Sequence, residues 1–86
     1  MDDYTITFAR SARKELEALE ASVVNRIFSK IEALAKEPRP TGCRKLHGGM
    51  NLWRIRVGDY RVVYAIHHKE RIVDIIAVRH RSEAYR

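Results

Sequence analysis

With 86 residues, the chain has the length of one small domain, near the size at which a single hydrophobic core is just large enough for stability. Its composition gives a net charge of +6, and its lone cysteine, Cys43, excludes an internal disulfide and a cysteine-based metal cluster. Because the sequence has no run of about 18 apolar residues and no signal-peptide pattern, we expect one cytoplasmic domain over residues 1–86, with no membrane insertion.

The first half of the chain predicts one strand followed by two helices. Residues 4–8 (YTITF) alternate apolar and polar side chains, which is typical of a half-buried strand. A helix is expected to begin at Ser11 as its N-cap and to break near residues 21–22. The second helix follows with apolar residues at three-and-four spacing, and Pro38 prevents its continuation. We expect the two helices to pack as a hairpin on one surface.

From Cys43 onward the apolar residues repeat with the period of two that is typical of strands. Residues 43–47 (CRKLH) predict a short strand, while residues 52–57 (LWRIRV) and 60–67 (YRVVYAIH) flank a Gly-Asp dipeptide suited to a tight hairpin turn. Residues 72–78 (IVDIIAV) are almost continuously apolar, which predicts a central strand covered on both faces. The fold class is therefore α+β: an N-terminal strand and a two-helix hairpin packed on a twisted, mainly antiparallel β-sheet.

The Gly-Asp turn determines which side chains of the predicted hairpin face each other. A two-residue loop places Val57 opposite Tyr60, and the apolar residues that follow in both strands then form one continuous layer, which the helices are expected to cover. On the other face, Arg56 lies directly opposite Arg61, and Arg54 is two residues along the same strand. Directly opposed like charges destabilise a sheet by up to about 1 kcal/mol, so another interaction must offset the repulsion.

Three explanations of the arginine pair remain open from the residues alone. Water and nearby acids can screen the charges, carboxylates of a partner protein can contact them, or a phosphate can bind to their forked donors. A polyanionic partner is compatible with the charge distribution, because residues 1–43 have no net charge and the whole +6 lies in residues 44–86. The C-terminal segment VRHRSEAYR supplies further candidates for such a site.

Several segments resemble the RelE/ParE superfamily of type II toxin–antitoxin toxins. They are the helix hairpin ending in EPR, the segment KLHGGMNLWRIRVGDYRVVYAI and the terminal VRHRSEAY, and the last of these is most similar to RelE, an mRNA interferase of the ribosomal A site. The resemblance implies a metal-independent endoribonuclease that needs no cofactor and inhibits translation. It implies as catalytic residues Arg54, Arg56, Arg61, Arg79 and Tyr85. Four further basic residues are expected to bind RNA: Arg44, Lys45, Arg81 and Arg86.

The chemistry implied by the resemblance uses the ribose 2′-hydroxyl as nucleophile and leaves a 2′,3′-cyclic phosphate. Arginine is a poor proton shuttle and a good clamp on phosphate charge, so we expect Arg56 and Arg61 to bind transition-state charge and Arg54 to position the backbone. Arg79 is expected on the side of the leaving 5′-oxygen. Tyr85 is the candidate general base, because nearby cations lower the pKa of a phenol; stacking on a base is its alternative role. Arg54 and Arg56 stand where the best-known members have lysines, which weakens any proton-transfer role for them.

The resemblance also implies partners and leaves two other functions open. The partners are an acidic antitoxin encoded by a neighbouring gene, which covers the cationic face, together with mRNA and the ribosome. One alternative is a ParE-type inhibitor of DNA gyrase without nuclease activity, although such members generally lack the full arginine and tyrosine set. The other is an inactive relative that binds nucleic acid. Trp53 and Tyr64 are expected in the core, and His67 and His68 are not expected to share a metal, because neighbouring strand residues point to opposite faces.

Overall fold

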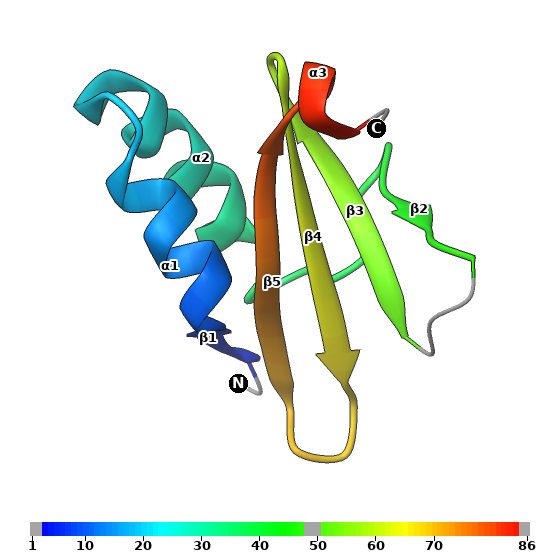
Figure 1. Cartoon of the computed structure of the whole chain (residues 1–86). Coiled ribbons are helices and arrows are strands. Elements are labelled where there is room, and N and C mark those ends of the chain that lie inside the picture. The colour runs from blue at the N-terminus through cyan, green and yellow to red at the C-terminus, as the bar shows by residue number, and fades with distance from the viewer. Residues whose placement is uncertain (1–2, 48–50, 85–86) are drawn as a thin grey trace.

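The computed structural model describes residues 3–47 and 51–84. The described elements follow in chain order as β1 (Thr5–Phe8), α1 (Arg10–Glu17), α2 (Ala21–Ala33), β2 (Arg44–Lys45), β3 (Leu52–Val57), β4 (Tyr60–His67), β5 (Ile72–His80) and α3 (Arg81–Ala84). The strands form one sheet in the order β1-β5-β4-β3-β2, and α1 and α2 lie together on one side of it (Figure 1). The predicted α+β fold is confirmed.

The hairpin of β3 and β4 has the bounds and the register that its sequence predicts. Val57 pairs with Tyr60, so the turn consists of Gly58 and Asp59. Gly58 has a φ of +61°, as a two-residue hairpin turn with glycine in the first position requires. The pairs β2–β3, β3–β4 and β4–β5 are antiparallel, while β1 is parallel to β5.

The prediction for β5 is wrong in its position and its burial. The central strand of the sheet is β4, and β5 lies between β4 and β1. Its side chains are not covered on both faces: Val73, Ile75 and Val78 are buried, whereas Ile76 is only partly buried. Because α1 and α2 cover one face of the sheet, the apolar run of β5 also places side chains on the other face, which we call the open face. The strand also extends to His80, two residues beyond the predicted end.

The core fills the space between the helices and the covered face of the sheet. It contains Ala12 and Leu16 of α1, Ile27 and Ile31 of α2, Leu34 and the inward residues of the strands, including Ile55, Val57, Val62, Tyr64, Ile66, Val73, Ile75 and Val78. The Tyr64 hydroxyl donates a hydrogen bond of 2.6 Å to the Pro38 carbonyl, and burial raises the pKa of this phenol, with the neighbouring Cys43 thiol adding to the effect. Trp53 is partly buried against the same core, so the prediction that Trp53 and Tyr64 are core residues is confirmed.

Helix α1 begins differently from the prediction. Its N-cap is Ala9, without a side-chain cap, and the Ser11 hydroxyl instead donates a hydrogen bond of 2.8 Å to the Ile76 carbonyl of β5. The reason is that β1 pairs with β5 only as far as Ile75, so the edge of β5 beyond this point needs another partner. The break between the helices also comes earlier than expected, at residues 18–20. In the described residues, no helix has the length and apolar character to cross a membrane.

Candidate nucleic-acid interface

Three arginines lie side by side across the open face, at the end of the sheet where the β3–β4 turn lies. Arg61 on β4 pairs directly with Arg56 on β3 and with Arg79 on β5. Their strand neighbours Val57 and Val78 are buried in the core, so the arginines point to the opposite face. Directly opposed side chains in an antiparallel sheet have Cβ atoms about 4.5–5.5 Å apart, so Arg61 lies close to both of the others, while β4 separates Arg56 from Arg79.

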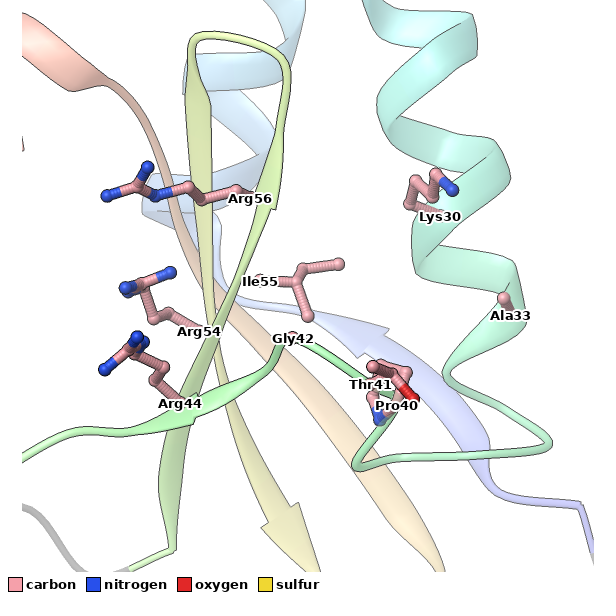
Figure 2. A pocket seen from close by; sticks show the side chains of 9 residues that line it. All are labelled: Lys30, Ala33, Pro40, Thr41, Gly42, Arg44, Arg54, Ile55 and Arg56. Atoms are coloured by element: carbon pink, nitrogen blue, oxygen red, sulfur yellow. The ribbon is translucent and has the colours of Figure 1, made fainter.

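A second pair of arginines extends this row along β3. Arg54 lies two residues from Arg56 and pairs with Arg44 on β2. Figure 2 shows Arg44, Arg54 and Arg56 extending to one side of β3, while Ile55 points to the other side, toward α2. Together with Arg61 and Arg79 they form what we call the arginine face (Arg44, Arg54, Arg56, Arg61 and Arg79).

Several hollows border the arginine face, and two of them are lined by more than one of its arginines. The larger, of about 470 Å³, is lined by Lys30, Ala33, Pro40, Thr41, Gly42, Arg44, Arg54, Ile55 and Arg56 (Figure 2). None of these lining residues is acidic, but the side chains of Arg44, Arg54 and Arg56 extend away from α2, which carries Lys30 and Ala33 of the same hollow. The smaller, of about 230 Å³, is lined by Arg56, Gly58, Asp59, Tyr60, Arg61 and Arg81.

The smaller hollow brings Arg81 beside the row of arginines. The Arg81 amide donates a hydrogen bond of 2.7 Å to the Asp59 carbonyl, and its Nη1 lies 3.9 Å from Asp59 Oδ1. The hairpin turn thereby holds the start of α3 next to Arg56 and Arg61. This ion pair is largely exposed, so its main consequence is the position of Arg81 rather than stability.

Not every predicted site residue joins the arginine face. In the register of β2, Lys45 pairs with Trp53, which alternates with the arginines and belongs to the covered face. Tyr85 and Arg86 lie outside the described residues. His80 packs edge-on against Tyr60 with ring centroids 5.2 Å apart, and its Nδ1 lies 2.9 Å from the Ser82 hydroxyl. In residues 3–47 and 51–84, no three His, Cys, Asp or Glu side chains are grouped as metal ligands would be.

Glu15 is a residue of the site that the sequence did not reveal. Its Oε2 lies 2.5 Å from Arg79 Nε, and its Oε1 accepts a hydrogen bond of 2.7 Å from the Val78 amide. A weak signal was available: Glu15 is three residues after Ala12 and four before Leu19, so it borders the apolar stripe of α1. A carboxylate at such a position needs a partner, but the partner is 64 residues away in the chain.

Known proteins share this architecture. The family model described as ParE toxin of type II toxin-antitoxin system, parDE, matches residues 6–85. The chain is 35% identical over 82 residues to a Mycobacterium tuberculosis protein named Toxin RelE, covering 95% of this chain and 81% of that protein. It is also similar to the toxin of an archaeal RelE-RelB complex from Pyrococcus horikoshii, with a TM-score of 0.81, 29% identity and coverage of 94% of this chain and 97% of that chain. For an isolated E. coli RelE toxin the TM-score is 0.80, at 29% identity, with coverage of 95% and 90%.

Proposed function

The chain belongs to the RelE/ParE superfamily of type II toxin–antitoxin toxins, as a toxin of RelE type, and from that premise we propose that it is an endoribonuclease that cleaves mRNA. The observation that supports this activity best is the row of Arg56, Arg61 and Arg79. Three cations in adjacent register positions repel one another, and a phosphodiester that accepts hydrogen bonds from them offsets this repulsion. Arg44 and Arg54, next to this row on β2 and β3, supply further positive charge for the rest of the RNA backbone.

The reaction we propose is attack of a ribose 2′-oxygen on the adjacent phosphorus. A bond forms between the 2′-oxygen and phosphorus, the bond to the 5′-oxygen breaks, and the products are a 2′,3′-cyclic phosphate and a 5′-hydroxyl. Tyr85 accepts the 2′-hydroxyl proton, and the leaving 5′-oxygen takes a proton from water. The substrate supplies its own nucleophile, so the protein contributes orientation and charge stabilisation, for which a metal ion is not required.

The arginines have distinct roles in this proposal. Arg56 and Arg61 donate hydrogen bonds to the non-bridging oxygens, where negative charge increases in the transition state. Arg79, at the β5 end of the row, binds on the side of the leaving 5′-oxygen. Arg54 and the more distant Arg44 position the RNA backbone, as does Arg81 beside the hairpin turn.

We also propose an acidic antitoxin as the partner of this chain. Two solved structures similar to it are named as complexes of RelE with RelB. An acidic chain that covers the arginine face would neutralise its charge and exclude RNA from it. Co-expression with the product of the neighbouring open reading frame should therefore yield a stable complex and relieve growth arrest. Absence of both would refute the antitoxin proposal without affecting the nuclease proposal.

A second candidate function is inhibition of DNA gyrase. It is favoured by the matching family model, which is described as a ParE toxin. We prefer RNA cleavage because the register assembles the arginines that a phosphodiester clamp requires. The third possibility, an inactive relative that binds nucleic acid, predicts RNA binding without fragments.

Two assays on the purified chain separate these functions. The chain is incubated with mRNA on translating ribosomes and with the same mRNA free in solution, and in parallel with gyrase and relaxed plasmid. RNA fragments that end in a 2′,3′-cyclic phosphate, with supercoiling unaffected, are the expected result. Inhibited supercoiling without RNA fragments would identify a gyrase inhibitor and refute the nuclease. If fragments form only on ribosomes, the ribosome is part of the site's substrate.

A further inference from the structure

We propose that Glu15 of α1 is a positioning residue that fixes the orientation in which Arg79 meets RNA. This inference rests on the proposed nuclease function and extends it to a residue outside the arginine face. Glu15 Oε2 accepts a hydrogen bond of 2.5 Å from Arg79 Nε, and Glu15 Oε1 accepts one of 2.7 Å from the Val78 amide. One carboxylate therefore contacts both the backbone and the side chain at the end of β5.

Glu15 binds Arg79 through Nε, which leaves the donors on the two Nη atoms for a ligand. A guanidinium group has five N–H donors, and Glu15 uses the one on Nε, so the four on the Nη atoms lie at the far end of the side chain. A hydrogen bond to Nε also fixes the plane of the guanidinium. The side chain of Arg79 remains 50% exposed, which is compatible with a role in binding a ligand from solvent.

Glu15 is itself held in place by the packing of α1 against β5. The Ser11 hydroxyl, one helical turn earlier, donates to the Ile76 carbonyl, and Glu15 accepts from Val78 two residues further along β5. Between them, Ala12 and the adjacent Leu16 are buried in the core. Arg79 is thus ordered during folding rather than when RNA binds, which lowers the entropic cost of placing it against the reacting phosphate.

Glu15 is not a second general base in this arrangement. Both of its oxygens already accept hydrogen bonds from N–H donors, and the side chain is 26% exposed beside a cation. Nor is the ion pair explained by stability, because pairs at this degree of exposure contribute little to it. The ion pair instead fixes the orientation of Arg79, so its loss should change the rate of mRNA cleavage.

The variant Glu15→Gln separates the two contacts of the carboxylate. The amide oxygen of Gln can still accept from the Val78 amide, while its NH₂ group is a donor that cannot accept from Arg79 Nε. We expect cleavage of ribosome-bound mRNA to fall about tenfold at saturating mRNA, since misplacement of a group that stabilises the transition state lowers the chemical step. A matched control, the exposed Glu17→Gln two residues further along α1, should stay within about twofold of the wild type.

A double variant tests whether Glu15 acts through Arg79. In the background of Arg79→Ala, Glu15→Gln should lower cleavage by no more than about twofold, because the residue it positions is absent. An equal fold-loss in both backgrounds would show that Glu15 acts by another route and would overturn the proposal.

An NMR readout distinguishes this inference from the proposed function. The Nε–Hε signal of Arg79, assigned by its loss in Arg79→Lys, should shift in Glu15→Gln and stay in place in Glu17→Gln. An unchanged signal in Glu15→Gln would refute the contact itself. If the signal shifts but the wild-type chain cleaves no mRNA, the nuclease proposal fails and the role of Glu15 in cleavage fails with it, while the contact stands.

Discussion

Arg61 on β4 is paired directly with Arg56 on β3, so the hairpin places two positive side chains in opposed positions on the open face. Arg79 of β5 adjoins Arg61 on its other side. Opposed like charges disfavour a sheet, yet the apolar pairs of the same hairpin lie in the core or pack against it and hold its register. The energy of core packing therefore maintains an arrangement of charges that suits an anionic ligand.

Replacing one member of the pair should stabilise the fold while lowering activity. In Arg56→Thr, the repulsion is lost and threonine suits a strand, so we expect the free energy of unfolding to rise by up to about 1 kcal/mol. Urea denaturation at low and high salt measures this, and the gain should shrink at high salt because salt screens the repulsion in the wild type. The part of the gain that comes from the repulsion should also disappear in the background of Arg61→Thr, so the gain should be smaller there; a variant less stable than the wild type would contradict the account.

The hairpin turn should tolerate few substitutions at Gly58. Its φ of +61° is unfavourable for a residue with a Cβ, and a Cβ there would lie 2.8 Å from Arg26 Nη2. Gly58→Ala should therefore lower the free energy of unfolding by about 1–2 kcal/mol, and Gly58→Asn by less, because Asn adopts positive φ more readily. Urea denaturation of both variants tests this, and an alanine variant as stable as the wild type would argue against the positive φ.

The stability of the protein should fall in alkaline solution partly through Tyr64. The folded protein raises the pKa of this phenol, so above the ordinary value of about 10 the unfolded chain loses a proton that the folded chain keeps. The stabilising contribution of the protonated Tyr64 phenol is fully present below pH 10 and is lost as the pH rises above it. In Tyr64→Phe, the free energy of unfolding should therefore decline less steeply above pH 10 than in the wild type. If the free energy of unfolding fell equally steeply with pH in the two proteins, Tyr64 would not titrate in this way.

Two substitutions distinguish the possible roles of Tyr85. A general base contributes about 10²–10⁴-fold to a rate, so we expect both Tyr85→Phe and Tyr85→Ala to lose cleavage by such a factor. Cleavage of ribosome-bound mRNA in single-turnover assays measures both losses. Retention of activity in the phenylalanine variant, with loss in the alanine variant, would assign Tyr85 to stacking on a base instead.

The sequence predicts the β3–β4 hairpin well because the information is local. A glycine-first turn and strict alternation determine that Arg56 faces Arg61, with no knowledge of the rest of the fold. The position of Arg79 beside Arg61 is different, because a register irregularity between Val63 and Tyr64 shifts the pairing of β4 with β5. Such a bulge changes which residues face each other and has no clear signal in these strands.

Long-range contacts explain the remaining differences. Ser11 has the residue type and position of an N-cap, but an unpaired strand edge competes for its hydroxyl. Glu15 is one of several acidic residues on the predicted helix, and its partner is specified only when α1 docks along β5. In both cases tertiary structure, rather than local preference, determines what the side chain contacts.

Mapping of mRNA cuts by primer extension in a reconstituted translation reaction tests the central claim most directly. The wild-type chain is compared with Arg61→Ala, which removes the middle of the arginine row, and with Arg13→Ala, which removes an exposed arginine of α1 that lines a different hollow. We predict cuts at A-site codons with the wild type and with Arg13→Ala, and their loss with Arg61→Ala. Undiminished cuts with a folded Arg61→Ala protein, or no cuts with the folded wild type, would contradict the assignment of the arginine face as the site of RNA cleavage.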